Sequence, residues 1–196
     1  QPNKYFIKSY GGEYVQNGYR VFNIEEKYVI VGEFLYQNSD RWGGYSLSIN
    51  EYGEEYSLDT IAESTRSISF ISAVQNNNSL DIVGFKRDIV TNEGVVVLHK
   101  LNNNEGLAYG KEIRATDYPN IAYTLSNSLD KGYVFGGEVW TDRNAPNSSY
   151  SDLHLVKIDS IGGVDWYKRY DYPYYCSIIK RITDPVNQVY YALASV

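Results

Sequence analysis

The feature that most constrains the fold of this 196-residue chain is a repeat of about 52 residues. Three segments align on a glycine that ends a short apolar run, and these glycines are Gly32, Gly84 and Gly137. In each segment a second apolar run follows, and a turn rich in Asn, Asp and Gly comes after it. Self-similarity at a fixed period indicates an architecture in which every unit packs against its neighbours.

Each repeat predicts four β-strands. The first strand of each is expected over residues 18–24, 67–74, 120–126 and 175–182. Polar turns join these strands to the next ones, which is a hairpin signal. Runs such as Val95–Leu98 are apolar at successive positions, so both of their faces must be covered. No segment has a sustained helical period, and the 21 tyrosines favour strands. The sequence therefore predicts an all-β fold.

Four-stranded units of this length, buried on both faces by their neighbours, are typical of β-propeller blades. We predict one domain over residues 1–196, a partial β-propeller with about 3.5 blades. The expected blades are 18–66, 67–118, 119–172 and an incomplete 173–196, with 5–12 as the outer strand of a closing blade. Because the chain ends inside an apolar strand, we expect a longer protein or a partner to cover that edge.

Four residues are expected to serve packing alone. The repeat glycines should allow a close approach of neighbouring backbone where a side chain would collide. Trp166, on the last strand of the third repeat, is expected to be a buried residue between blades.

The third repeat carries the most regular motif. Its residues, in order, are Gly132, Tyr133, Gly137, Asp152, Lys157, Asp159, Gly163, Trp166, Lys168 and Tyr170. This order resembles the repeats of exported β-propellers from Bacteroidetes-type bacteria. Phe6–Gly12 is similar to the end of such a unit, with Phe6 in place of Trp. The second repeat departs from the motif, with Asn102 where Asp is usual and Tyr109 where Trp is expected.

The resemblance implies an exported protein located in the periplasm, at the outer membrane or on the cell surface. Proteins of this kind are frequently attached to secretion or surface assemblies. Gln1 fits the mature end left by signal-peptide cleavage, and an arbitrary boundary fits it equally well. The resemblance also implies O-glycosylation at Thr60 and Ser160, because each lies in an Asp-(Ser/Thr)-apolar triplet.

Charge and hydropathy exclude two classes of partner. The chain has 24 acidic and 18 basic side chains, a net charge of -6, whereas nucleic acids and anionic membranes attract clustered Lys and Arg. No apolar run approaches the ~18 residues of a membrane span. We therefore expect neither nucleic-acid binding nor membrane insertion.

No metal or cofactor site is predicted. His99 and His154 lie on third strands without a further ligand nearby, so we interpret them as ordinary strand residues. Cys176 is the only cysteine and is interpreted as a buried structural thiol. Asn102–Gly106 resembles the start of a calcium loop but lacks the bidentate Glu, which favours a hairpin turn.

The sequence also argues against an enzyme. Gly163 and Trp166 match part of a box found in sialidase-like glycosidases, but Ile161 stands where that box has Asp. Glycoside hydrolysis needs two convergent carboxylates, and the acidic residues here are scattered over turns.

The longest loops point to a binding face. Residues 35–43, 86–92 and 139–150 are long, unlike one another and expected at one end of the blades. Their aromatic and arginine side chains form the mixture that is enriched in protein interfaces. The candidate binding residues are Arg41, Trp42, Arg87, Trp140, Arg143 and Tyr150. An alternative is that each Trp folds back over its own blade.

We therefore expect a non-enzymatic, exported protein-interaction or scaffold module of the bacterial envelope. Its expected partner is another envelope or secretion-system protein. Two alternatives stay open: a glycan-binding module, because exposed Trp and Tyr stack on sugars, and a glycosidase-like enzyme.

Overall fold

The computed structural model describes residues 7–12, 15–36, 39–91, 93–102, 106–140, 151–171, 177–184 and 189–195. Within these ranges the chain forms fourteen β-strands and no helix, which confirms the all-β prediction. None of the described residues belongs to a helix long and apolar enough to cross a membrane.

The strands form three four-stranded sheets and one two-stranded sheet, all antiparallel and in sequence order. The first sheet contains β1 (Gln16–Ile24), β2 (Lys27–Leu35), β3 (Trp42–Ile49) and β4 (Glu55–Ile61). The second contains β5 (Arg66–Asn76), β6 (Ser79–Asp88), β7 (Gly94–Asn102) and β8 (Gly106–Ile113). The third contains β9 (Asn120–Asn127), β10 (Tyr133–Trp140), β11 (Ser151–Ile158) and β12 (Val164–Tyr170). The fourth contains β13 (Ser177–Asp184) and β14 (Val189–Ser195).

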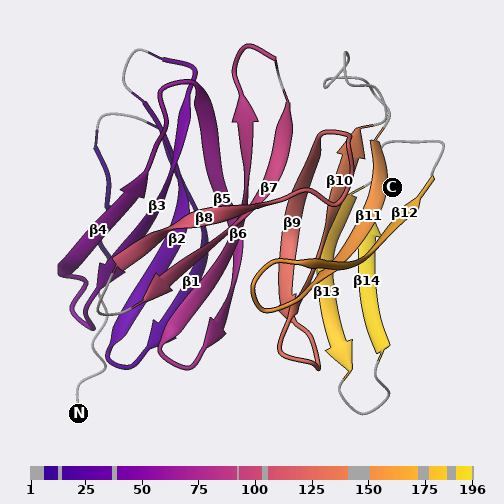
Figure 1. Ribbon diagram of the computed structural model, residues 1–196. Coiled ribbons are helices and arrows are strands. Elements are labelled where there is room, and N and C mark those ends of the chain that lie inside the picture. The colour runs from indigo at the N-terminus through magenta and orange to yellow at the C-terminus, as the bar shows by residue number, and fades with distance from the viewer. Residues whose placement is uncertain are drawn as a thin grey trace.

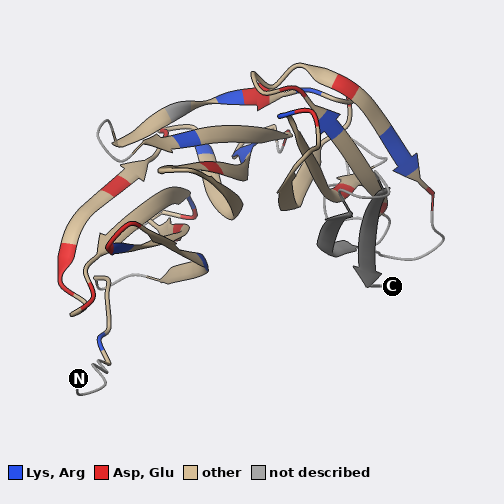
Figure 2. Ribbon diagram, turned by 90° about the horizontal axis from the view of Figure 1, so that it is seen from below, with Lys and Arg blue, Asp and Glu red and all other residues tan. Residues whose placement is uncertain are grey.

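The sheets follow one another along an arc (Figures 1 and 2). Figure 2 shows the first strands of the sheets on the concave side and β4, β8 and β12 on the convex side. Each first strand contacts the first strand of the next sheet: β1 contacts β5, β5 contacts β9, and β9 contacts β13. The strands β2, β6 and β10 finish at the same end of the sheets, which we call the loop end.

Two apolar layers hold the first three sheets together. One fills the space between the first and second sheets and contains Val31, Phe70 and Ile82, and the other, between the second and third, contains Val96 and Phe135. The second sheet contributes side chains to both layers, so burial on both faces, predicted from its apolar run, is confirmed.

The repeat glycines lie where no side chain fits. A Cβ on Gly32 would stand 1.9 Å from the carbonyl oxygen of Asn17, and the same clash recurs at the other two. At Gly84 the oxygen is that of Ser69, at 1.9 Å, and at Gly137 it is that of Ile121, at 1.8 Å. The predicted close backbone approach is therefore confirmed.

The same position carries a β-bulge in every first strand. The register skips Tyr19 in β1, Ile71 in β5 and Tyr123 in β9, each beside the repeat glycine of the second strand. A bulge leaves one residue without a cross-strand partner and changes the direction of its side chain. Each of these three first strands therefore has one residue without a cross-strand partner.

The N-terminal segment corrects a prediction. Residues 7–12, which we call the strap, form no strand, although residues 5–12 were expected to form an outer one. No described strand offers the strap a backbone ladder, so its side chains make the contacts. Lys8 Nζ and Tyr10 OH donate to the Gly53 carbonyl oxygen at 3.0 and 2.8 Å, and Tyr10 packs against the buried cluster of Tyr45, Leu47 and Ile49. Residues 5 and 6 lie outside the described ranges.

Candidate functional site

A hollow that we call the inner groove lies at the loop end on the concave side of the described residues. It has a volume of about 600 Å³. Its walls come from the first and second sheets, and β9 of the third sheet completes them. The lining residues are Tyr19, Glu33, Asp40, Trp42, Ser67, Ser69, Ile71, Phe85, Arg87, Asp88, Ile89, Ile121 and Tyr123.

The β-bulges help to form this groove. All three bulged residues, Tyr19, Ile71 and Tyr123, belong to its lining. Because the bulge releases each residue from cross-strand pairing, its side chain can turn toward the concave side. One backbone irregularity, repeated three times, thus supplies side chains from three sheets to one site.

Glu33 is held in the groove by hydrogen bonds from two side chains. Its carboxylate accepts hydrogen bonds from Tyr19 OH at 2.5 Å and Asn17 Nδ2 at 3.1 Å, and its side chain is buried. Burial, together with the hydrogen bond to this carboxylate, raises the pKa of Tyr19 above its ordinary range. Tyr19 therefore stays protonated and holds Glu33 in place.

The remaining charges give the groove an acidic excess. Asp88 accepts the backbone amides of Val90 and Thr91, both at 2.9 Å, and these bonds lower its pKa. Arg87 is partly buried, and desolvation lowers its pKa. The lining contains three carboxylates, those of Glu33, Asp40 and Asp88, and one guanidinium, and Asp88 also pairs with Arg66 at 3.7 Å. The lining residues therefore carry more negative than positive charge.

Two of the six predicted binding residues lie together in this groove. Trp42 is half-buried, and its backbone amide donates to Ser67 Oγ at 3.2 Å, which ties β3 to β5. Arg87 comes from the end of β6. Arg143 and Tyr150 lie outside the described residues.

Arg41 points elsewhere. Its guanidinium lies over the Tyr36 ring, 5.6 Å from the centroid, and donates to the carbonyl oxygen of Ser64 at 2.5 Å. Arg41 therefore fastens the link between the first and second sheets.

Trp140 corrects the expectation of an exposed binding residue. It is only 7% exposed, at the end of β10. A Cβ placed on Gly94 of the second sheet would stand 3.5 Å from Cζ3 of the Trp140 ring. The ring thus occupies space that Gly94 leaves empty, so Trp140 is a packing residue between two sheets.

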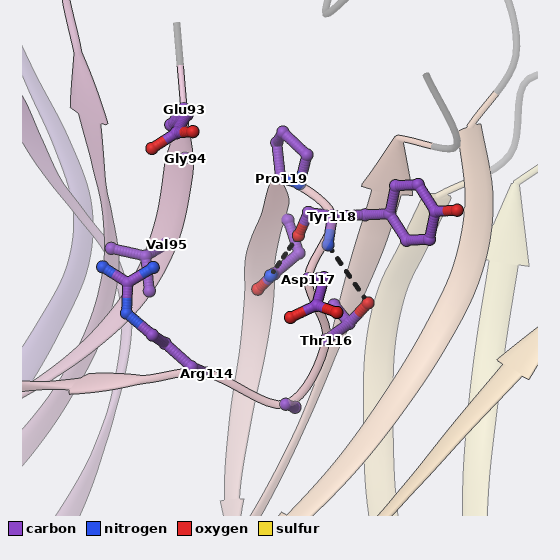
Figure 3. Close-up of a pocket in the computed structure, with 10 residues that line it drawn as sticks. Glu93, Gly94, Val95, Arg114, Thr116, Asp117, Tyr118 and Pro119 are labelled. Carbon is purple, nitrogen blue, oxygen red and sulfur yellow. Dashed lines mark hydrogen bonds between the residues drawn. The ribbon is translucent and has the colours of Figure 1, made fainter. Parts of the chain in front are cut away.

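A second hollow, of about 380 Å³, lies between the start of β7 and the link from β8 to β9 (Figure 3). Its polar groups bond mainly within the link: the Tyr118 amide donates to Thr116 Oγ1, and Asn120 Nδ2 donates to the Tyr118 carbonyl. Arg114, on its rim, pairs with Glu112 at 2.8 Å. We assign this hollow to the packing of the link.

Both histidines lie in the interior. His99 Nδ1 is 3.2 Å from the Ala108 carbonyl oxygen, and His154 Nε2 is 3.1 Å from that of Ile121. Burial lowers the pKa of His154 to about 4. Their interpretation as strand residues agrees with these contacts. Among the described residues, no three His, Cys, Asp or Glu side chains group as metal ligands would. Cys176 and residues 103–105 lie outside the described ranges.

Trp166 is half-buried rather than buried, with Lys168 Nζ 5.8 Å from its ring centroid. The neighbouring Tyr167 contacts the apolar layer between the second and third sheets instead. Strand alternation explains the difference, because successive residues face opposite sides of a sheet. The two predicted glycosylation residues, Thr60 and Ser160, are exposed.

Sequence reasoning missed most of the groove. Tyr19, Ile71 and Tyr123 are spaced at the repeat length, which was the available signal. Glu33 and Phe85 follow the repeat glycines directly and could have been found in the same way. No protein-family model matches this chain, and no curated protein matches it significantly.

Proposed function

We propose that this chain is part of a β-propeller that acts as a non-enzymatic protein-binding or scaffold module of the bacterial envelope. The four-stranded sheets, their shared bulge and the meeting of their first strands support the propeller architecture. The repeat motif supports export, and a secretion-system or other envelope protein is the proposed partner.

The inner groove is the observation that carries the binding role. A rigid wall of three first strands presents aromatic rings and charged groups from several loops and strands, which suits a specific contact. Half-buried Trp42 beside Arg87 is the kind of pair that anchors protein interfaces. The acidic excess of the lining favours a partner segment that carries Lys or Arg.

The test is affinity capture from native envelope extract, using the wild-type chain and the variant Trp42→Ala. Loss of a central aromatic anchor should weaken partner binding by about 2 kcal/mol, roughly 30-fold. Trp166→Ala is the matched control, because it also removes a Trp side chain, but one on β12 that does not line the inner groove. Equal capture by wild type and Trp42→Ala would exclude the groove as the binding site.

A glycan is the second candidate ligand. Tyr19, Trp42 and Tyr123 offer rings from three strands next to carboxylates, an arrangement that suits stacking and hydrogen bonding to a sugar. Retention on a polysaccharide matrix, lost in Trp42→Ala and without a stoichiometric protein, would favour this ligand. We propose no glycosidase, because Glu33 and Asp88 are already engaged by Tyr19 and by backbone amides.

A further inference from the structure

The first sheet has one covered face and one open face. Its covered face contributes Val29 and Val31 to the layer shared with the second sheet. The register places a row of four apolar residues on the other face, one from each strand: Val21, Ile30, Leu47 and Leu58. We call this row and its surroundings the open face. Val21 is 63% exposed and Leu58 is 54% exposed, at the two ends of the row.

The same row exists in the second sheet, and there it is buried. Ala73, Ile82 and His99 are cross-strand partners at the equivalent positions. Ala73 and Ile82 belong to the apolar layer against the first sheet.

The third sheet repeats the arrangement. Leu125, Phe135, Val156 and Tyr167 form the equivalent row of partners. The first three are buried in the layer against the second sheet, and Tyr167 packs onto them. Each of these rows is therefore the face by which a sheet packs against the sheet before it. In the first sheet that face has no preceding sheet among the described residues.

At the other end of the arc, the last sheet also has an uncovered face. The β13–β14 sheet contacts β9, β10 and β11, and no described strand packs on its far side. The strap covers part of the open face, because Tyr10 packs against the cluster that contains Leu47, which is 5% exposed, but Val21 on β1 stays exposed. First strands meet first strands within the chain, so β13 of another copy would meet this uncovered part near β1.

We propose that the open face binds the β13–β14 sheet of a second copy of this chain. A head-to-tail contact of this kind repeats the packing already present between the sheets, and such contacts close into a ring when the rotation permits. Two copies supply eight sheets, two of them two-stranded, within the range of about four to eight blades found in propellers. The product is a dimer, and this inference rests on the proposed propeller architecture.

Sedimentation equilibrium of the 196-residue chain over a wide concentration range tests the dimer. The expected mass at high concentration is twice the chain mass of 22.4 kDa. Val21→Lys combined with Leu58→Lys should raise the dissociation constant by about tenfold or more, since it places charge in an apolar contact. Val90→Lys is the matched control, because Val90 is 85% exposed in the turn after β6 and lies outside the open face. It should leave the dimer intact.

Amide hydrogen exchange supplies a readout that does not depend on the variants. Exchange in β1 and β14 should slow as the wild-type concentration rises. Any one of three results overturns the proposal. The wild-type chain stays monomeric, the double variant dimerises as tightly as wild type, or amide exchange does not change with concentration. The double variant keeps the inner groove unchanged, so envelope capture by that monomer would leave the proposed function standing while self-association fails.

Discussion

The two interfaces between the complete sheets differ at their loop ends. Between the first and second sheets, Trp42 and Arg87 line an open groove. Between the second and third sheets, Trp140 fills the corresponding space over Gly94. Register shows that the pairs are equivalent, because Arg87 pairs with Gly94 at the same end of its sheet as Leu35 with Trp42.

This comparison shows how one repeat can produce both a closed and an open interface. A large residue facing a glycine closes the gap, as Trp140 and Gly94 do. At the equivalent positions of the first interface stand Trp42 and Arg87, and both line the inner groove. The two interfaces therefore carry different side chains at equivalent positions, while the strands keep one register.

The largest expected loss of stability comes from disrupting the close backbone approach at a repeat glycine, which all three complete sheets share. Gly137→Ala should destabilise the protein by about 4 kcal/mol or more, because its Cβ would overlap the Ile121 carbonyl oxygen. Gly94→Ala is the control, since its Cβ would meet Trp140 at an ordinary 3.5 Å. Urea denaturation should separate the two. Similar losses for both variants would mean that the bulge can relax.

Trp140→Ala should remove the ring that fills the space over Gly94 between the second and third sheets. Loss of a buried Trp is expected to lower the free energy of unfolding by about 3–5 kcal/mol. Trp42→Ala should cost much less stability, because its side chain is half-buried at the edge of a hollow. The difference in urea midpoint measures the asymmetry between the interfaces. Equal midpoints would show that both tryptophans pack alike.

Burial lowers the pKa of one histidine at each interface, His99 at the first and His154 at the closed one. The His154 pKa falls from its ordinary 6.5 to about 4, so between these values the unfolded chain binds a proton that the folded chain does not. Stability due to this group is full above pH 6.5 and falls as the pH drops toward 4. The slope is at most about 1.4 kcal/mol per pH unit, about 3 kcal/mol in total. In His154→Gln, urea titrations at several pH values should show a flatter dependence. An unchanged slope would assign the proton uptake to other groups.

The smallest stability effect is expected from exchanging the two loop-end arrangements. Arg87→Trp combined with Trp42→Gly gives the first interface the pair found in the second. We expect a change in unfolding free energy within about 1 kcal/mol, because a packed ring replaces a half-buried one. Partner capture should be lost, because the groove is filled. Retained capture by a folded double variant would place the binding site elsewhere.

The periodic features of the fold were predictable from the sequence, whereas the site was mostly not. The repeat glycines mark the strands because, in each complete repeat, a neighbouring carbonyl oxygen leaves no space for a side chain at that position. Burial of Trp140 depends on the absence of a side chain at Gly94, some 46 residues earlier, which matters only after two sheets have packed. The bulges were missed because one extra residue breaks the alternation that identifies a strand face. The direction of Tyr19 could therefore not be derived from its neighbours.

The sequential order of strands within each sheet has a consequence for biosynthesis. Every described strand pairs only with the strand before or after it, so the pairing within a sheet needs only its own short stretch of chain. Such local pairing lowers the entropy lost in closing long loops and favours rapid folding. During synthesis each finished sheet can serve as the template on which the next one condenses, so folding can advance along the arc in step with translation.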